Sequence, residues 1–190
     1  MVHKFDAKKA GILDDPERVK FLDPASILEK LDLKEDMVLA DLGCGTGFLS
    51  IPAAMRVKKV FSLDIQEKML DILKEKIKTE RITNIEVLHS GESSIPLSDI
   101  SVDIIVMANV FHELEDRFSM LKEVNRVLKK NGRLIIIDWK KMEMDFGPPL
   151  QERLDEKEVI DTCSENGFTI VEKLNAGPYN YLLIFDIYFK

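Results

Sequence analysis

The fold is decided by the stretch Val38-Leu39-Ala40-Asp41-Leu42-Gly43-Cys44-Gly45-Thr46-Gly47-Phe48. Its apolar start predicts a short buried strand, and the closely spaced glycines after it predict a tight loop. Glycines let backbone N–H groups approach a ligand without obstruction by side chains. The stretch therefore predicts a strand, a ligand-binding loop and a helix, in that order.

The spacing of the glycines separates two classes of ligand. The dinucleotide fingerprint places glycines at positions one, three and six, the last for close contact between helix and strand. Here Phe48 stands at the sixth position, and the third glycine, Gly47, comes one place early. Asp41, two residues before the first glycine, would repel a phosphate and attract a sulfonium or an ammonium group. The loop therefore favours a positively charged amino-acid ligand over a pyrophosphate.

A second carboxylate favours a nucleoside ligand. Asp64 ends the next predicted strand, about twenty residues beyond the glycines, where a carboxylate accepts hydrogen bonds from a ribose diol. The alternative is that Asp64 only caps the helix that begins near Gln66. The two roles are compatible, and we expect Asp64 to contact the ligand.

Outward from the loop, short apolar runs alternate with amphipathic segments, as in a doubly wound α/β sheet. The predicted strands are Met37 to Leu42, Val60 to Asp64, Ile85 to Leu88, Val102 to Met107 and Leu134 to Asp138. The predicted helices are Phe48 to Met55, Gln66 to Thr79, Arg117 to Lys130 and Glu156 to Glu165. An antiparallel hairpin is predicted from two further strands, Thr169 to Leu174 and Tyr181 to Phe189. We expect a Rossmann-like sheet of seven strands, mostly parallel, with this hairpin at one edge.

The N-terminal part is expected to be helical. Asp15-Pro16 and Asp23-Pro24 each place a capping carboxylate before a proline, which suits the first turn of a helix. Residues 1–36 are therefore predicted to form a helical extension or lid, and residues 37–190 a single compact domain. His3 and Phe5 lie in a segment that is expected either to close over the ligand or to be disordered.

Composition narrows the class of partner. The chain has 190 residues, a net charge of −7 and a sequence pI near 5.1, which argue against a broad electrostatic grip on nucleic acid. Its two cysteines form no C-x-x-C pair, so no metal site and no disulfide framework are expected. No apolar run is long enough for a signal peptide or a membrane span, so the cytoplasm is the expected location.

Five segments resemble, in the same order, motifs of class I S-adenosylmethionine (SAM)-dependent methyltransferases. They are Asp41 to Gly47, Ser62 to Ile65, Ser90 to Leu97, Asp103 to Leu114 and Leu128 to Asp138. The resemblance covers nearly the whole chain. It is closest to the subgroup related to ubiquinone and menaquinone biosynthesis methyltransferases, and it implies SAM as the cofactor.

The resemblance assigns cofactor contacts to ten residues: Asp41, Gly43, Cys44, Gly45, Asp64, Ile65, Gly91, Glu92, Ser93 and Asn109. It places the methionine moiety at Asp41 and at the backbone of the first two glycines, and the ribose at Asp64. Ile65 would pack on the adenine ring. Glu92 occupies the adenine-amine position, where many relatives have the shorter Asp. Asn109 would face the sulfonium end of the cofactor.

Methyl transfer needs a general base only when the acceptor is a weak acid. His112, just past the end of a predicted strand, is the best candidate, and the alternative is a packed or capping histidine. Asp116 stands where a zinc motif would need its second histidine. The loop Asp145 to Leu150 follows the same predicted strand and is expected to shape the acceptor pocket. Trp139, at the same edge, is expected either to line that pocket or to pack at its rim.

These observations favour a SAM-dependent methyltransferase that acts on a small-molecule acceptor. A protein or RNA methyltransferase is the first alternative, and an acidic chain without appended domains disfavours it. A nicotinamide-dependent oxidoreductase is disfavoured by Phe48 and Asp41. A SAM-binding subunit without activity is a further alternative. The sequence predicts neither the acceptor nor the oligomeric state.

Overall fold

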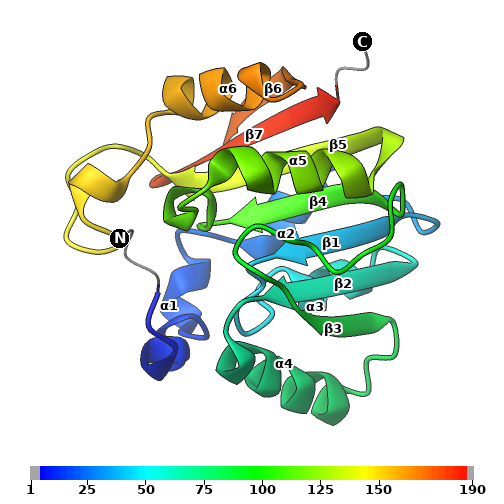
Figure 1. Ribbon diagram of the computed structural model, residues 1–190. Helices are drawn as coiled ribbons and strands as arrows, with labels where there is room; N and C mark the ends of the chain where they lie inside the picture. Colours follow the sequence, from blue (N-terminus) through cyan, green and yellow to red (C-terminus); the bar gives the residue numbers. More distant parts are fainter. Residues whose placement is uncertain (1–4, 188–190) are drawn as a thin grey trace.

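A computed structural model describes residues 5–187 and contains one sheet of seven strands in the order β3-β2-β1-β4-β5-β7-β6 (Figure 1). The strands are β1 (Val38–Leu42), β2 (Lys59–Asp64), β3 (Ile85–His89), β4 (Val102–Ala108), β5 (Leu128–Trp139), β6 (Phe168–Asn175) and β7 (Asn180–Ile187). Strands β1 to β5 are parallel, and β7 pairs antiparallel with both β5 and β6. The predicted doubly wound, mostly parallel sheet with an antiparallel hairpin is confirmed.

Helices cover both faces of the sheet because its central strands are apolar on both sides. The helices are α1 (Pro16–Val19), α2 (Pro24–Glu29), α3 (Ser50–Ala54), α4 (Glu67–Glu80), α5 (Arg117–Val127) and α6 (Glu156–Glu165). Three 3₁₀ turns accompany them: η1 (Ala7–Ile12), η2 (Phe111–Glu113) and η3 (Leu150–Glu152). In β4, Ile104 and Val106 pack with α2 and α3, whereas Ile105 and Met107 pack with α5 and α6. Figure 1 shows α5 and α6 together on one face of the sheet.

Capping carboxylates begin the helices where the sequence predicts them. The side chain of Asp15 accepts a hydrogen bond from the backbone N–H of Glu17, and Pro16 is the first residue of α1. Asp23 accepts in the same way from Ala25 and begins α2. Helix α6 has the predicted limits. The 3₁₀ turn η1 lies within the predicted helical extension, although no start signal was identified for it.

The predicted helix from Arg117 to Lys130 is wrong at its C-terminal end. Helix α5 ends at Val127, because Leu128 has an extended backbone (φ −69°, ψ 138°) and pairs with Val102 of β4. Leu128 is 1% exposed, so its burial in the sheet outweighs the helical signal of the following lysines. The fifth strand therefore begins at Leu128 rather than Leu134.

The C-terminal hairpin inserts into the sheet by its second strand. Strand β7 lies between β5 and β6, and its residues Tyr181 to Phe185 are almost fully buried. Phe189, the predicted end of this strand, lies outside the described residues. Among residues 5–187, no helix combines the length and the apolar character that crossing a bilayer requires.

Candidate active site

The candidate site lies where the strand order reverses. The chain runs from β1 outward to β3 and then returns to place β4 on the other side of β1. Crevices at the carboxyl ends of strands form ligand sites at such a switch point. In Figure 1, α1 and the loop after β5 gather at this edge of the sheet.

The three glycines of the loop have different steric roles. All have positive φ, at 75° for Gly43, 52° for Gly45 and 94° for Gly47, a region that L-residues with side chains rarely adopt. A Cβ at Gly43 would lie 2.3 Å from Val110, and a Cβ at Gly47 would lie 2.4 Å from Leu73. These two glycines are therefore required by packing within the protein.

Gly45 faces the cavity. A Cβ at this position would meet, within 4 Å, only the Leu13 side chain, at 3.2 Å. A larger side chain would therefore project into the space in front of the loop. Gly47, one place early for the dinucleotide fingerprint, provides the close packing onto helix α4, so Phe48 does not have to.

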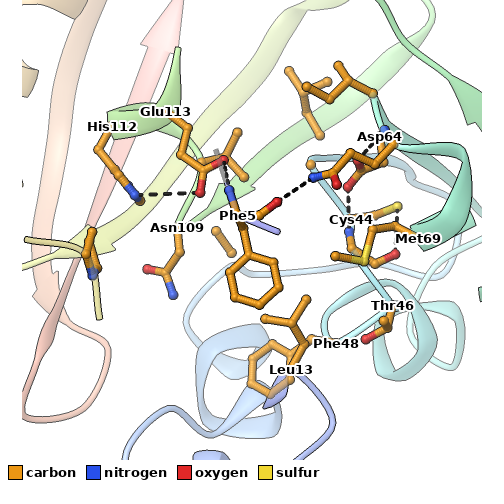
Figure 2. Close-up of a pocket in the computed structure, with 18 of the residues that line it drawn as sticks. Phe5, Leu13, Cys44, Thr46, Phe48, Asp64, Met69, Asn109, His112 and Glu113 are labelled. Atoms are coloured by element: carbon orange, nitrogen blue, oxygen red, sulfur yellow. Dashed lines mark hydrogen bonds and ion pairs between the residues drawn. The ribbon is translucent and has the colours of Figure 1, made fainter. Parts of the chain in front are cut away.

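The cavity at this edge has a volume of about 600 Å³. It is lined by the loop after β1, the ends of β2 and β4, the N-terminal turns and the loop after β5 (Figure 2). Nine of the ten predicted cofactor residues line it: Asp41, Gly43, Cys44, Gly45, Asp64, Ile65, Gly91, Glu92 and Asn109. Ser93 is not among the lining residues, whereas His112 is.

Asp64 joins the ends of β1 and β2. One of its carboxylate oxygens accepts a hydrogen bond from the backbone N–H of Gly45 at 2.9 Å, and the other accepts from Gln66 at 2.8 Å. Its side chain is only 7% exposed, and burial raises the pKa of its carboxyl group. Each oxygen can accept a second hydrogen bond. The contact with Gln66 and a contact with a ribose are therefore compatible.

Asp41 lies deeper, at the end of β1, and is 2% exposed. Burial is the largest influence on its carboxyl group and raises its pKa to about 6, in spite of a hydrogen bond from Ser50. The Ser50 hydroxyl donates to Asp41 Oδ2 at 2.6 Å and in turn accepts from Ser62. At neutral pH the carboxylate is therefore mostly ionised and fixed by β1, β2 and α3.

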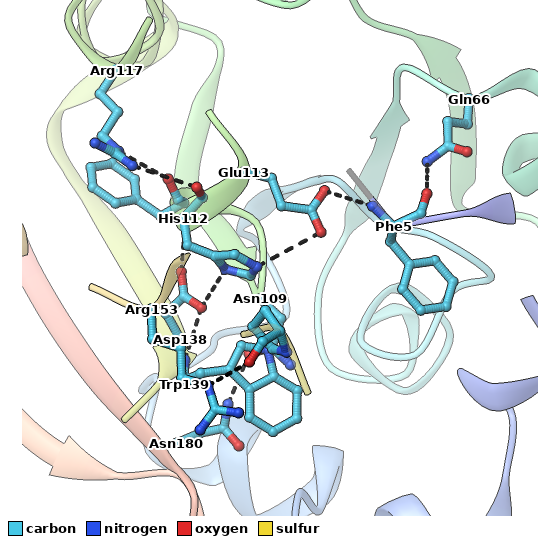
Figure 3. Close-up of polar contacts among 12 residues, drawn as sticks. Phe5, Gln66, Asn109, His112, Glu113, Arg117, Asp138, Trp139, Arg153 and Asn180 are labelled. Atoms are coloured by element: carbon cyan, nitrogen blue, oxygen red, sulfur yellow. Dashed lines mark hydrogen bonds and ion pairs between the residues drawn. The ribbon is translucent and has the colours of Figure 1, made fainter. Parts of the chain in front are cut away.

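His112 lies in η2, directly after β4, and is buried against the end of β5 (Figure 3). Its Nδ1 lies 2.7 Å from Oδ1 of Asp138, and its backbone N–H donates to Oδ2 of the same carboxylate at 3.0 Å. The backbone N–H of Trp139 also donates to Asp138 Oδ1. Because an ionised carboxylate only accepts, Nδ1 carries the proton and Nε2 presents a lone pair when the imidazole is neutral.

Opposing effects set the pKa of His112. Burial, the largest single influence, lowers the pKa, but the charge and the hydrogen bond of Asp138 raise it, as does the charge of Glu113. The net pKa is raised above its usual 6.5. Glu113 Oε1 lies 3.8 Å from His112 Nε2, which is too long for a hydrogen bond but close enough for electrostatic attraction.

Two partners at this edge were missed from the sequence. Asp138 was treated only as the end of a strand, although an acid after four aliphatic residues at the carboxyl edge of the sheet was a usable signal. Asn180 donates from Nδ2 to the amide oxygen of Asn109 at 2.8 Å. Asn109 has a left-handed backbone (φ 60°), and the partner of its side-chain oxygen comes from the C-terminal hairpin.

Aromatic rings form the wall of the cavity on the side of the loop after β5. Phe146 lies 6.0 Å from Trp139, 5.2 Å from Phe21 and 4.9 Å from Tyr179 between ring centroids. Trp139 lines the cavity and also packs against Phe146 of the loop. The buried Arg153 fixes the loop by donating to the carbonyls of Met142, Phe146 and Pro148.

The N-terminal segment crosses the cavity. The backbone N–H of Phe5 donates to Glu113 Oε2 at 3.3 Å, and its carbonyl accepts from Gln66 Nε2 at 2.9 Å. Figure 2 shows Phe5 between Glu113 on one side and Asp64 on the other. The described part of the segment thus links the ends of β4 and β2. His3 lies outside the described residues.

Comparison with known proteins identifies the family. Residues 40–136, about half of the chain, match the family described as methyltransferase domain. A demethylmenaquinone methyltransferase of Lactococcus lactis is 32% identical over 117 residues, which are 60% of this chain and 46% of the relative. A ubiquinone/menaquinone biosynthesis C-methyltransferase of Campylobacter jejuni is 32% identical over 120 residues, 60% of this chain and 49% of the relative. The chain spans about half the length of these curated relatives.

A solved structure matches over nearly the full length. The crystal structure of a SAM-dependent methyltransferase from Aquifex aeolicus superimposes with a TM-score of 0.92 at 39% identity. The match covers 97% of this chain and 100% of that one. The chain is thus similar to methyltransferases of ubiquinone and menaquinone biosynthesis. It belongs to the methyltransferase domain family and has the class I SAM-dependent methyltransferase fold.

Proposed function

We propose that this protein transfers a methyl group from SAM to a small-molecule acceptor. The observation that carries the proposal is one cavity with two different ends. The glycine loop and two buried carboxylates, Asp41 and Asp64, form one end. His112, Trp139 and Phe146 form the other, so a cofactor and an acceptor can meet between them.

The end at β1 fits the chemical groups of SAM. A sulfonium and an ammonium group are attracted by the ionised Asp41, which is buried and fixed by Ser50. Asp64 has remaining acceptor capacity for a ribose diol beside its two backbone hydrogen bonds. The open space in front of Gly45 lets the backbone approach a ligand.

The protein's own residues supply alignment and proton transfer. Bound SAM supplies an electrophilic methyl group. The aromatic wall and the Phe5 segment hold the acceptor in line and exclude water, which is the main contribution of a protein to this reaction. His112 Nε2 accepts a proton from an acidic acceptor, while Asp138 holds the ring in position and stabilises the resulting imidazolium.

The size and lining of the cavity support a small, ring-shaped acceptor. Its volume of about 600 Å³ lies in the range of small-molecule sites, and aromatic rings suit a planar ligand. The relatives from Lactococcus lactis and Campylobacter jejuni are named for quinone substrates, which also contain a ring. The cytoplasmic location and the absence of a nucleic-acid partner stay predictions from the sequence.

The test is transfer of a labelled methyl group from SAM to fractions of a cell extract. We expect label in the small-molecule fraction with the wild-type protein and none with Gly45→Val. Label that appears only in protein or RNA would contradict the small-molecule proposal. Tight binding of NADH in a fluorescence titration, without binding of SAM, would instead favour the oxidoreductase alternative.

A further inference from the structure

The lining of the cavity is strongly acidic and contains one permanent cation. Among the described residues, Arg18 is the only arginine or lysine that lines it. The acidic lining residues are Asp6, Asp15, Glu17, Asp41, Asp64, Glu92, Glu113 and Glu115. The sulfonium and ammonium groups of SAM account for acidic residues in the lining. They do not account for an arginine among those acids.

The Arg18 side chain is held at the glycine-loop end of the cavity. Its Nη1 donates to the carbonyl of Leu13 at 3.1 Å, and its guanidinium carbon lies 3.9 Å from the ring centroid of Phe48. Leu13 is also the side chain nearest to the cavity face of Gly45. Figure 2 labels Leu13 and Phe48, the two residues that contact Arg18 here. The guanidinium therefore lies beside the loop that receives the amino-acid part of SAM.

No carboxylate of the described residues forms an ion pair with Arg18. Asp14, the acid whose charge acts most on Arg18, pairs with Lys76 at 2.6 Å and accepts from Thr46. Of the two acids nearer in sequence, Asp15 caps α1 and Glu17 pairs with Lys20. Asp41 acts on Arg18 through its charge, without an ion pair. Burial lowers the pKa of Arg18 to about 10, so the group stays protonated at neutral pH. A charged guanidinium thus lines the cavity with N–H donors that no residue of the described part of the chain accepts.

The amino-acid part of SAM carries a carboxylate as well as an ammonium group. Next to Asp41 and Asp64, that carboxylate would be repelled unless a cation accompanied it. A guanidinium offers a planar pair of N–H donors that matches a carboxylate. We infer that Arg18 binds the α-carboxylate of SAM, so that helix α1 contributes a cofactor-binding residue. This inference rests on the proposed function.

The alternative role of Arg18 is structural, as a link between α1 and the glycine loop through Leu13 and Phe48. A structural link would affect every ligand of the cavity equally. A carboxylate contact affects only ligands that have the carboxylate. Calorimetric titrations with SAM and with decarboxylated SAM, which differ in this one group, separate the two roles.

We expect Arg18→Met to weaken SAM binding about ten- to a hundredfold, the loss of charge-assisted hydrogen bonds. Binding of decarboxylated SAM should change by no more than about twofold. Arg18→Lys keeps the charge but loses the planar pair of N–H donors, so it should retain part of the SAM affinity. Lys20→Met is the matched control, because Lys20 follows α1, pairs with Glu17 and does not line the cavity.

Equal losses for both ligands, or no loss for SAM, would overturn the role of Arg18 while leaving the proposed function intact. A folded wild-type protein that binds neither ligand would overturn both. Thermal unfolding of each variant shows whether it is folded. Should Arg18→Met fail to fold, the ratio of the two affinities in Arg18→Lys decides in the same way.

Discussion

Asp138 is the residue on which the chemistry of His112 depends. Its carboxylate accepts hydrogen bonds from Nδ1–H and from the backbone N–H of His112, so it fixes both the tautomer and the orientation of the ring. Because the pKa of His112 is raised, the neutral base form gains population only as the pH rises above about 6.5. We expect kcat for an acidic acceptor to rise with pH through this raised pKa.

His112→Ala should lower kcat about 10²- to 10⁴-fold, the usual contribution of a general base. Asp138→Asn removes the main influence that raises the pKa, so the pKa of His112 should fall. An NMR titration of the imidazole measures that shift. Glu113→Gln is the control and should lower the pKa less, because Glu113 lies 3.8 Å from the ring. An unchanged pKa in Asp138→Asn would contradict the pairing.

The same pair makes stability depend on pH. A raised folded-state pKa means that the interaction stabilises the protein fully below the unfolded value near 6.5 and is lost as the pH rises through the folded value. The protonated histidine thus favours folding, whereas the neutral histidine is the form needed for catalysis.

Gly45 lines the cavity, and a side chain at this position would occupy the space that we assign to the ligand. Gly45→Val adds atoms into the cavity and forces a branched side chain to adopt φ 52°. We expect loss of SAM binding, measured by calorimetry. Gly11→Val is the matched control, since nothing lies within 4 Å of a Cβ there and its φ is not positive. Retained binding in Gly45→Val would argue against a ligand in front of the loop.

Among the elements of the site, the N-terminal segment is joined to its neighbours through Phe5, which makes two hydrogen bonds within the described residues. Gln66→Ala removes the donor to the Phe5 carbonyl, a hydrogen bond worth about 1 kcal/mol. We expect faster hydrogen exchange in residues 5–12 and unchanged exchange in the strands. Gln151→Ala, at an exposed position outside the cavity lining, is the control. Equal exchange in both variants would show that the contact does not hold the segment.

One buried side chain supplies three hydrogen bonds to the loop after β5. Arg153 is 3% exposed and donates to three carbonyls of the segment between Met142 and Pro148. Arg153→Met leaves these carbonyls without their partner and should lower the free energy of unfolding by about 3 kcal/mol. The fluorescence of Trp139, the single tryptophan of the chain, should change as well, because Phe146 packs against it. A variant with wild-type denaturation and emission would refute this role.

The elements that the sequence predicts well are those set by local chemistry. Asp15 and Asp23 cap helices because each needs only the backbone of the next few residues. The end of α5 was predicted wrongly, because the extended backbone of Leu128 depends on pairing with Val102, which is distant in sequence. Long-range pairing overrides a local helical signal.

At the scale of the whole molecule, the parallel sheet follows from apolar runs that alternate with amphipathic helices. The order of the strands does not follow from the sequence, because no residue pattern in β7 predicts that it inserts between β5 and β6. The site divides in the same way. Asp41 and Gly45 share one motif and line one cavity. By contrast, His112 lies in the turn after β4 and Asp138 near the end of β5, and these two segments are far apart in sequence. Arg18 was missed because it carries no motif.

We propose that the carboxyl edge of this sheet binds SAM. Calorimetric titration with S-adenosylhomocysteine, the demethylated product, measures binding at this edge. We predict that one molecule binds per chain and that Asp64→Ala weakens binding by about 1–3 kcal/mol, the loss of a charge-assisted hydrogen bond. A folded wild-type protein that binds neither this product nor SAM would contradict a SAM site at this edge.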